Sequence, residues 1–424
     1  MLELILYAFL AVQIGICFYL LLPFLFVLTS SLMPVSSEDA ALASGAVPSE
    51  TPGSSSGETG IACVITAYKE KEFAFLLVDS LLKQSYSNYR IFLVADRCEA
   101  EENDPFNDKL SIIYPEKPLD SKVSSLRMAM SQIDADKLPY TLVFDPDNLA
   151  HPEYLAELNA ALLKGYKAVQ TRRTAKNLNT NMACIDAAGE HYYHITQRLA
   201  PFRLGSSATI AGSGMAIETS LYSRLLDETQ QSFAEGEVIV AEDKILQNHL
   251  VMMNFIIAYA PNAILYDEKV VSAAQVQRQR TRWINSWFGY FKEALALAVF
   301  GVKKLSSNAL LFGLMISTPP LFLLLLAGAF LALLSWFLTP AFAPYMSASV
   351  IVFGLTFMLS LYMAQADRRI WKALFSVPLF ISRQLLAMLN IKKANTSFME
   401  TTHEKRLTIE EVMADIGVFK RVKS

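Results

Sequence analysis

Residues 4–33 form an unbroken stretch without a charged side chain, LILYAFLAVQIGICFYLLLPFLFVLTSSLM. About 20 apolar residues in a helix are enough to cross the hydrocarbon core of a bilayer, and this stretch is longer than that. A secretory signal peptide is the alternative, but it begins with positive charge and has an apolar core of only about 7–15 residues. The residues before the apolar stretch include the acidic Glu3 and no Lys or Arg. We therefore predict a retained transmembrane helix within residues 1–33.

Two further uncharged stretches lie in the last third of the chain, at residues 309–338 and 343–364. Each is long enough to cross a bilayer, and Pro319 and Pro320 are expected to kink the first of them. Basic residues flank the pair on both sides, namely Lys303, Lys304, Arg368, Arg369 and Lys372. Since segments rich in Lys and Arg stay on the cytoplasmic side, we expect the preceding domain in the cytoplasm, at the cell inner (plasma) membrane.

The remaining segments complete a predicted organisation. Residues 371–391 carry Lys372 and Arg383 among apolar residues, which favours an interfacial helix over a third span. Residues 34–60 are rich in Ser, Gly, Pro and Ala, a composition typical of a flexible linker. The predicted order is a transmembrane helix (1–33), a linker (34–60), a soluble domain (61–292), a membrane region (293–391) and a cytoplasmic tail (392–424).

Charge and cysteine usage exclude some classes of protein. The formal net charge is −3, so the chain presents no strong positive field and we expect no nucleic-acid partner. The four cysteines form no CxxC pair. Cys17 lies in an apolar stretch and Cys63 in a predicted strand, so buried thiols are favoured over disulfides or zinc ligands. This usage fits a reducing compartment.

Residues 61 to about 270 alternate strand and helix patterns. Apolar runs at 61–68, 90–96 and 140–145 predict strands, and helical spacing at 72–84 and 122–133 predicts helices. This alternation indicates a wound α/β domain with mostly parallel strands. Such sheets bind ligands in the crevice beyond the carboxyl ends of their strands. Asp96, Asp145 and Asp147 all stand at predicted strand ends, so we expect them at one crevice.

Asp145 and Asp147 hold two like charges side by side, which costs free energy unless a cation or hydrogen bonds offset it. A surface turn is the simplest interpretation, since Asp, Pro and Asn are common in turns. A metal site is the alternative, because Mg²⁺ and Mn²⁺ bind one or two carboxylates and complete their shell with phosphates and water. A phosphatase motif with a nucleophilic Asp is disfavoured, since that motif usually opens its domain and has Thr or Val in place of Leu149.

Three other segments have both a structural and a functional interpretation. In IAGSGMAIET (210–219), two glycines allow close backbone approach to a ligand, although Gly-Ser-Gly is also common in ordinary turns. In VIVAEDKIL (238–246), the acids either complement a helix dipole or supply Asp243 as a general base. TRRTAKN (171–177) is interpreted as a solvated or acceptor-facing stretch.

Residues 275–291, QVQRQRTRWINSWFGYF, lead from arginines and glutamines into a group of aromatic residues. Anchoring at a membrane interface explains this composition by itself. Arg is also a preferred partner of phosphate oxygens, and Trp presents a flat face to a sugar ring. Both uses are compatible.

Several of these segments occur in the same order as the motifs of one enzyme family. In chain order they are ITAYKE, Asp96, DPDN, GSGMAI, AED and QRTRW. The set, over about residues 60–290, resembles the membrane-bound family 2 glycosyltransferases, which include cellulose, chitin and hyaluronan synthases and ceramide glucosyltransferase relatives. The resemblance implies a GT-A fold, a Rossmann-like α/β domain that transfers sugars from nucleoside diphosphates, joined to transmembrane α-helices.

The resemblance also implies a role for each matching residue. Asp147 would bind Mg²⁺ or Mn²⁺ at the diphosphate, and Asp243 would be the catalytic base. Contacts to the nucleotide sugar are implied for Ala67, Tyr68, Glu70, Asp96, Lys122, Asp145, Gln279 and Arg282. Contacts to the acceptor are implied for Gly214, Glu242 and Trp283. The implied reaction is an inverting transfer from a UDP-sugar to a lipid or glycan acceptor at the cytoplasmic face of a membrane.

The sequence departs from the family's pattern at two residues. Lys69 stands where Asn is more frequent, and Ala241 stands where Thr usually precedes the acidic pair. The number of membrane segments is also smaller than in the large polymer synthases.

Single transfer and processive polysaccharide synthesis therefore both stay open. The Gln-x-x-Arg-Trp motif favours polymerisation, whereas the few spans favour single transfer. An inactive membrane scaffold that binds nucleotide sugar is the alternative from another class of protein. The intact acidic motifs and Arg282 argue against it.

Overall fold

The computed structural model describes residues 2–33, 57–233, 241–271, 273–378, 381 and 406–417, with the backbone alone at residues 2 and 273–283. The predicted linker and most of the predicted tail lie outside these residues, as does most of the predicted interfacial helix. Three predicted elements agree closely with strands β1 (Ile61–Tyr68), β2 (Tyr89–Asp96) and β4 (Tyr140–Phe144). The predicted helices correspond to α3 (Lys71–Leu82) and α4 (Lys122–Met130).

The chain divides into two compact units, each made of segments that are distant in sequence. The second unit, which contains the strands and which we call the α/β unit, comprises Val35–Ala183, Ser207–Val270 and Glu400–Ser424. The membrane unit comprises Met1–Pro34, Cys184–Ser206 and Val271–Met399.

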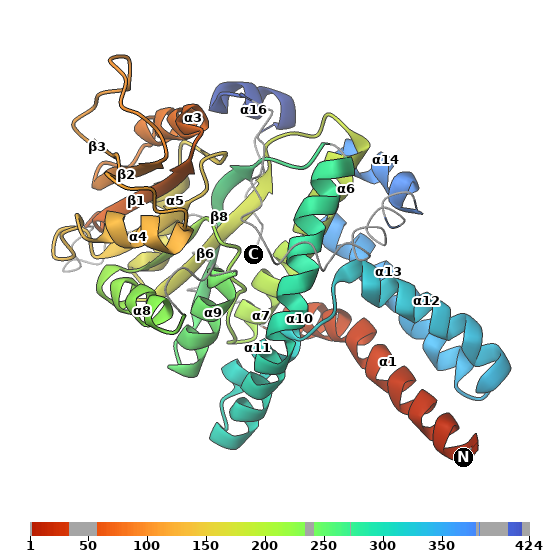
Figure 1. Ribbon diagram of the computed structural model, residues 1–424. Helices are drawn as coiled ribbons and strands as arrows, with labels where there is room; N and C mark the ends of the chain where they lie inside the picture. The colour runs from red at the N-terminus through yellow and green to blue at the C-terminus, as the bar shows by residue number, and fades with distance from the viewer. Residues whose placement is uncertain are drawn as a thin grey trace. The chain divides into compact units, whose positions relative to one another are not determined.

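The α/β unit is built on an eight-stranded sheet of order β3-β2-β1-β4-β7-β6-β8-β5 (Figure 1). The remaining strands are β3 (Leu110–Ile113), β5 (Leu149–Ala150), β6 (Ala168–Ala175), β7 (Met215–Glu218) and β8 (Ile257–Asp267). Strands β3, β2, β1 and β4 run parallel, and β7 runs antiparallel to both β4 and β6. Strand β8 is parallel to β6 and antiparallel to β5.

This topology gathers chain ends along one edge of the sheet. Because β1, β2, β4, β6 and β8 share a direction, their carboxyl ends lie at the same edge. The reversed strand β7 brings its amino end there, together with the glycine-containing loop that precedes it. The α/β architecture predicted from the sequence is confirmed. The ligand crevice predicted from the sequence would lie at this edge, beyond the carboxyl ends of the strands.

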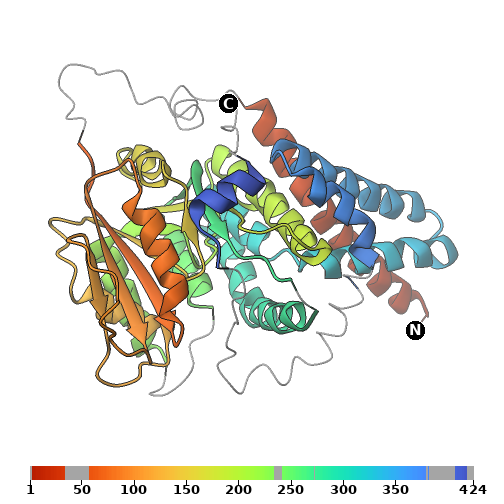
Figure 2. The same cartoon turned by 90° about the horizontal axis from the view of Figure 1, so that it is seen from above.

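Helices cover both faces of the sheet (Figures 1 and 2). Helices α4, α8 (Thr219–Gln231) and α9 (Glu242–Met252) lie on one face, and α3 and α5 (Tyr154–Leu162) lie on the other. The short helix α16 (Ile409–Ile416) begins with a capping box between Thr408 and Glu411. It buries Ile409 and Val412 against Leu149, Ile264 and Tyr266, and thereby covers the β8–β5 end of the sheet.

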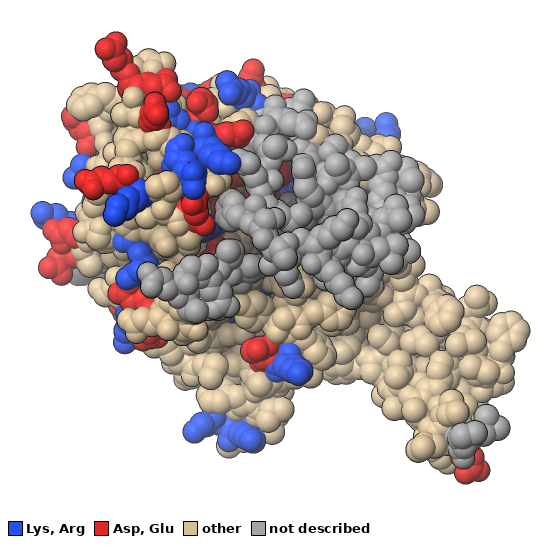
Figure 3. Space-filling view, in the orientation of Figure 1, with Lys and Arg blue, Asp and Glu red and all other residues tan. Residues whose placement is uncertain are grey.

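The membrane unit contains three helices that are long and apolar enough to cross a membrane within the part of the chain that is described. They are α1 (Leu2–Leu32), α12 (Leu321–Leu338) and α13 (Ala343–Met363). On the face shown in Figure 3, the surface over these helices carries almost no charged side chains apart from the end of α1. Inside the unit, Gln13 Nε2 donates to Ser335 Oγ at 2.5 Å and to Thr339 Oγ1 at 3.1 Å. These hydrogen bonds satisfy the polar amide of Gln13, which lipid chains could not do.

The apolar stretch 309–338 forms two helices rather than one kinked span. Helix α11 (Ser307–Ile316) ends before Pro319 and Pro320, and α12 begins at Leu321. Proline lacks the N–H that a helix needs and its ring clashes with the preceding turn, so two successive prolines end the helix here. Helix α11 instead packs against α10 (Ala273–Lys304), where a Cβ on Gly301 would lie 2.3 Å from the backbone N of Leu310.

The membrane unit also includes a segment from the middle of the chain. Helix α6 (Asn181–Tyr193) continues into a π-helical turn, η1 (His194–Leu199), and α7 (Ala200–Arg203). Tyr192 packs in a cluster with Cys17, Leu20, Leu324 and Phe353, and its ring stacks on Phe357 at a centroid distance of 5.5 Å. The chain between β6 and β7 is thus tied to the membrane helices. After α13, it continues through α14 (Arg368–Ala373) and a 3₁₀ turn, η2 (Leu374–Ser376).

Candidate active site

The first two strand ends are joined through Asp96. Tyr68 and Asp96 are register partners, and the backbone N–H of Lys69 donates to the Asp96 carbonyl at 2.9 Å. The Asp96 carboxylate is 1% exposed and accepts the backbone N–H groups of Leu119 and Asp120 at 3.0 and 2.8 Å. Asp96 therefore fixes the segment that leads into α4. Among the neighbouring predicted residues, Ala67 is buried and Tyr68 and Glu70 are half-buried.

The residue that follows Asp96, Arg97, forms an ion pair. Arg97 contacts both carboxylate oxygens of Asp120 at 2.6 Å, and Tyr68 donates a hydrogen bond to the same carboxylate. The Arg97 guanidinium and Tyr68 hold the pKa of the Asp120 carboxyl below its usual value. Tyr68 at the end of β1 and Arg97 just after β2 are thereby joined through Asp120 at this edge.

The most concentrated charge in the site surrounds Lys122, the first residue of α4. Its Nζ donates to Asp145 Oδ1 at 2.7 Å and to the carbonyl of Gly212 at 3.0 Å, and it lies 3.7 Å from Glu242 Oε1. Residues from α4, the end of β4, the loop before β7 and the start of α9 thus meet at one ammonium group. We refer to Lys122, Asp145, Gly212 and Glu242 as the lysine cluster.

The pKa directions in the lysine cluster follow from burial and neighbouring charge. Burial lowers the pKa of Lys122, but the carboxylates of Asp145 and Glu242 outweigh it and raise that pKa to about 12. Burial raises the pKa of Glu242, and Asp243 adds to this rise while Lys122 opposes it. Lys122 is therefore firmly charged, and Glu242 favours its protonated form more than a free Glu does.

Asp243 stands beside the glycine loop. Its Oδ1 accepts the N–H of Lys244 at 2.9 Å, and a Cβ built on Gly212 would lie 3.9 Å from its Oδ2. Gly212 and Gly214 both have positive φ, +77° and +64°. A Cβ on Gly214 would lie 2.5 Å from Thr171 Oγ1, so only glycine fits there. The loop can approach a ligand through its backbone at this point.

Several residues other than glycine take left-handed backbone conformations at this edge. They are Lys69 (φ 64°), Arg97 (φ 56°), Asp120 (φ 48°) and Ala241 (φ 60°). Such strain is concentrated at functional sites in known proteins. A β-branched Thr at position 241 would be strongly disfavoured in this conformation.

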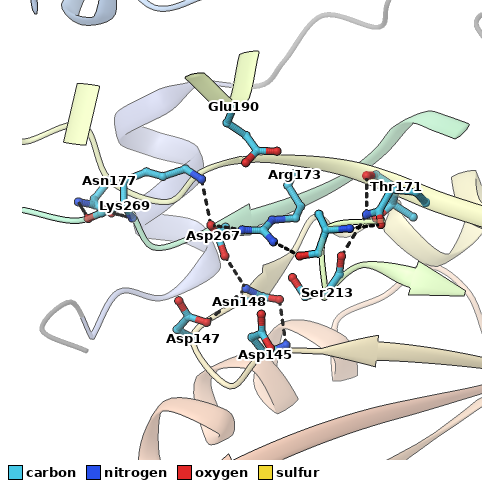
Figure 4. A network of polar contacts seen from close by, with 12 residues as sticks. Asp145, Asp147, Asn148, Thr171, Arg173, Asn177, Glu190, Ser213, Asp267 and Lys269 are labelled. Atoms are coloured by element: carbon cyan, nitrogen blue, oxygen red, sulfur yellow. Dashed lines mark hydrogen bonds and ion pairs between the residues drawn. The ribbon is translucent and has the colours of Figure 1, made fainter. Parts of the chain in front are cut away.

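The turn after β4 is held by buried polar contacts (Figure 4). Asn148 donates from Nδ2 to Asp147 Oδ1 at 3.3 Å and to Asp267 Oδ1 at 3.1 Å. Its Oδ1 accepts the backbone N–H of Asp145 at 3.1 Å. Asp267, at the end of β8, is paired with Arg173 and Lys269 at 2.6 and 2.9 Å. Asn148 thus contacts both acids of this turn and links the turn to Asp267 at the end of β8.

The stretch TRRTAKN is not solvated, contrary to one interpretation of the sequence. It forms the end of β6 and the residues after it, with Arg172 2% exposed and Lys176 1% exposed. Lys176 Nζ donates to the Asp147 carbonyl at 3.1 Å, and burial lowers its pKa. The strand crosses the interior of the sheet, so its basic side chains lie within the unit beside the acids of neighbouring strand ends.

The donor set fits a divalent ion that completes its shell with phosphate and water. Asp147 is 7% exposed and its carboxylate is oriented by Asn148, while Asp145 is already neutralised by Lys122. In the described ranges, no three His, Cys, Asp or Glu side chains are grouped to hold a metal. Mg²⁺ and Mn²⁺ require only one or two carboxylates when a substrate supplies oxygens, so Asp147 fits such an ion as the principal protein ligand.

Three predicted residues, Gln279, Arg282 and Trp283, belong to helix α10. Their side chains lie outside the described part of the chain. Their roles stay predictions.

Sequence reasoning missed four residues of this site: Asn148, Arg173, Asp267 and Lys269. A signal for Asp267 was present, because the apolar run AILY ends at Asp267 just as LVF ends at Asp145. The partnership of Arg173 with Asp267 had no local signal, because it depends on β6 and β8 being neighbours.

Comparisons with known proteins bear on the family. A family model described as glycosyltransferase like family 2 matches residues 59–286, more than half of the chain. Together with the mixed eight-stranded sheet, this match confirms the predicted GT-A fold class. A comparison with curated proteins finds no match.

Solved structures give weaker similarities. The mannosyltransferase PcManGT from Pyrobaculum calidifontis, in complex with GDP-Man and Mn²⁺, is 13% identical, with a TM-score of 0.49 over 93% of this chain and 99% of that one. TarS from S. aureus is 12% identical, with a TM-score of 0.36 over 60% of this chain and 55% of TarS. TarS 1–349 in complex with UDP is 14% identical, with a TM-score of 0.34 over 53% of this chain and 64% of that one.

The lysine cluster makes a prediction about stability. Replacing Lys122 by Met should leave Asp145 and Glu242 without their cation. Breaking a buried pair costs about 3–5 kcal/mol, and partial exposure reduces this to about 1–3 kcal/mol. Without Lys122 the pKa of Glu242 rises further, so the folded state binds an additional proton as the pH falls. The loss of Tm should therefore be larger at pH 8 than at pH 5.

Thermal unfolding of the detergent-solubilised chain at both pH values measures this difference. Lys122→Arg, which keeps the positive charge, is the matched control. An equal loss of Tm at both pH values would show that repulsion among the carboxylates is not the cause.

Proposed function

The chain belongs to the glycosyltransferase-like family 2, and from this membership we propose that it is an inverting, metal-dependent enzyme that transfers a sugar from a UDP-sugar to a lipid or glycan acceptor. The observation that carries the proposal is the meeting of Asp145, the Gly212 loop and the Glu242-Asp243 pair around Lys122. The proposed nucleotide side and the proposed base thereby lie at one sheet edge.

In the proposed reaction, an acceptor hydroxyl attacks the anomeric carbon of the donor sugar and the bond to the diphosphate breaks. Asp243 accepts the hydroxyl proton as the general base. A single attack on the far face inverts the anomeric centre, and no covalent intermediate on the protein is required. The Gly212–Gly214 loop offers backbone groups on which donor and acceptor can be aligned.

The leaving diphosphate gathers negative charge that the site has to balance. When bound, Mg²⁺ or Mn²⁺ supplies Lewis-acid stabilisation of that charge. Asp147 is the proposed ligand, and Arg282 of the Gln-x-x-Arg-Trp motif is the proposed guanidinium partner of the phosphates. Asp145 is proposed to contact the nucleotide sugar, because Lys122 already neutralises it.

The uridine side of the site is proposed at the ends of β1 and β2. Ala67, Tyr68, Glu70 and Asp96 line this part of the edge. Gly214, Glu242 and Trp283 are proposed on the acceptor side, and Gln279 near the diphosphate.

We further propose an integral membrane protein with its α/β unit in the cytoplasm, organised as the sequence predicts. The docking of α16 supports this topology. Because α16 packs on β5 and β8, the sheet of the α/β unit and α16 lie on the same side of the membrane. The chain between β8 and α16 must therefore cross an even number of times, which α12 and α13 provide. The interfacial position of residues 371–391 and single transfer rather than polymer synthesis stay predictions from the sequence.

The enzymatic proposal predicts metal-dependent release of the nucleotide. Detergent-solubilised protein would be assayed for nucleoside diphosphate release with Mn²⁺ or Mg²⁺ and a membrane-lipid extract as the acceptor source. Donors would be UDP-glucose, UDP-galactose, UDP-N-acetylglucosamine, UDP-glucuronate and, as a test of the uridine assignment, GDP-mannose. We expect one UDP-sugar to be consumed, and Asp243→Asn to lower kcat about 10²–10⁴-fold by removing the base.

The matched control is Asp227→Asn, which changes a surface carboxylate paired with Arg127. Binding of UDP with metal but no turnover of any donor would favour the scaffold. Full activity in Asp243→Asn would exclude this residue as the base.

The topology makes a separate prediction. Single-cysteine variants at exposed Ser131 and Glu410 should react with a membrane-impermeant maleimide from the same side of sealed, oriented vesicles. A cysteine at exposed Ala341, between α12 and α13, should react only from the opposite side. The native cysteines would first be replaced by Ser. Labelling of positions 131 and 410 from different sides would contradict the even number of crossings.

A further inference from the structure

Asp267 lies at the same sheet edge as the Asp-Pro-Asp-Asn turn, but at the end of a different strand. Its Oδ2 accepts hydrogen bonds from Arg173 Nη2 at 2.6 Å and from Lys269 Nζ at 2.9 Å. Its Oδ1 accepts from Asn148 Nδ2 at 3.1 Å. Figure 4 shows this carboxylate between the two basic side chains and Asn148. Asp267 is therefore paired with two basic side chains through Oδ2, while its Oδ1 accepts a hydrogen bond from the turn.

Asn148 connects this acceptor to the two acids. Its side chain is fully buried, its Nδ2 also donates to Asp147 Oδ1 at 3.3 Å, and its Oδ1 accepts the N–H of Asp145 at 3.1 Å. An amide has a donor end and an acceptor end, and its neighbours decide which way it points. Ionised Asp267 can only accept, so it requires the NH₂ group of Asn148 on its side. The carbonyl end of Asn148 is then left for the N–H of Asp145.

We propose that Asp267 is a positioning residue, which sets the orientation of the Asn148 amide and through it the geometry of Asp147 as a metal ligand. This inference rests on the proposed function, because it takes Asp147 to be the ligand of Mg²⁺ or Mn²⁺. It adds a chain of contacts from Arg173 and Lys269 through Asp267 and Asn148 to Asp147.

The proposal predicts how an isosteric change would act. In Asp267→Asn, the carbonyl oxygen of the new amide is drawn to Arg173 and Lys269, since both can only donate. Its NH₂ group then faces the NH₂ group of Asn148. Two donors repel, so Asn148 either loses this contact or turns its carbonyl towards residue 267. A turned Asn148 would oppose the N–H of Asp145 with a donor and release Asp147.

Partners that orient metal ligands from behind typically change metal affinity about 10–100-fold when they are removed. We therefore expect Asp267→Asn to raise the dissociation constant for Mn²⁺ about 10–100-fold in the presence of UDP. The constant would be measured on the full chain in detergent from the loss of the free Mn²⁺ signal in electron paramagnetic resonance. Activity should return at high Mn²⁺ concentration, because kcat depends on the bound metal and the metal can still bind.

A double-mutant cycle tests the route through Asn148. Asn148→Ala removes the amide, so adding Asp267→Asn to it should change the Mn²⁺ dissociation constant little further. Asp227→Asn, a charge change of the same kind on α8, should leave the constant unchanged. Thermal unfolding of each variant, and UDP binding without metal, show that the site is still folded.

The outcomes separate the inference from the proposed function. If the wild-type chain binds Mn²⁺ and Asp267→Asn binds it equally well, the positioning role is overturned and the metal site stands. If the two substitutions add in full, Asp267 does not act through Asn148. If the wild-type chain binds UDP but no Mn²⁺, the metal role of Asp147 fails and the positioning role fails with it.

Discussion

The ammonium group of Lys122 is the contact on which the rest of the site depends. It joins the start of α4 to the end of β4, the loop before β7 and the start of α9. Asp145, Glu242 and Asp243 would otherwise repel one another in a part-buried space, and like charges held there destabilise the folded state. One cation therefore allows the acids proposed for donor binding and for proton transfer to lie close together at one sheet edge. Its raised pKa shows that this arrangement stabilises the charged form.

The sheet topology explains why residues so distant in sequence can meet. Strands β1, β2, β4, β6 and β8 end at one edge, and the reversed β7 delivers Gly212 and Gly214 to the same edge. With β7 parallel to its neighbours, this loop would lie at the opposite edge and Lys122 would lose the Gly212 carbonyl. The segment between β6 and β7 makes a second connection, since Tyr192 packs among the membrane helices. Residues 184–206 of this segment therefore belong to the membrane unit, although the strands on either side of the segment belong to the sheet.

The sequence was sufficient where the determinants are local. The apolar runs that end at Tyr68, Asp96 and Asp145 predicted β1, β2 and β4 closely, because hydrophobic pattern sets a buried strand. It was insufficient where pairing is non-local. Nothing near Arg173 in the sequence indicates a buried ion pair with Asp267. The polar composition of TRRTAKN is compatible with a solvated segment, whereas the stretch is buried because β6 lies between β7 and β8. The break at Pro319 and Pro320 was expected as a kink, whereas two consecutive prolines separate α11 from α12.

A structure of the full chain with Mn²⁺ and UDP would test the central claim most directly, namely that this sheet edge is a nucleotide-sugar site organised around Lys122. The account predicts Mn²⁺ bound to a carboxylate oxygen of Asp147 and to the diphosphate, with Lys122 still on Asp145 and the uracil beside Asp96. UDP bound elsewhere, or Mn²⁺ held by Asp145 with Lys122 displaced, would contradict it.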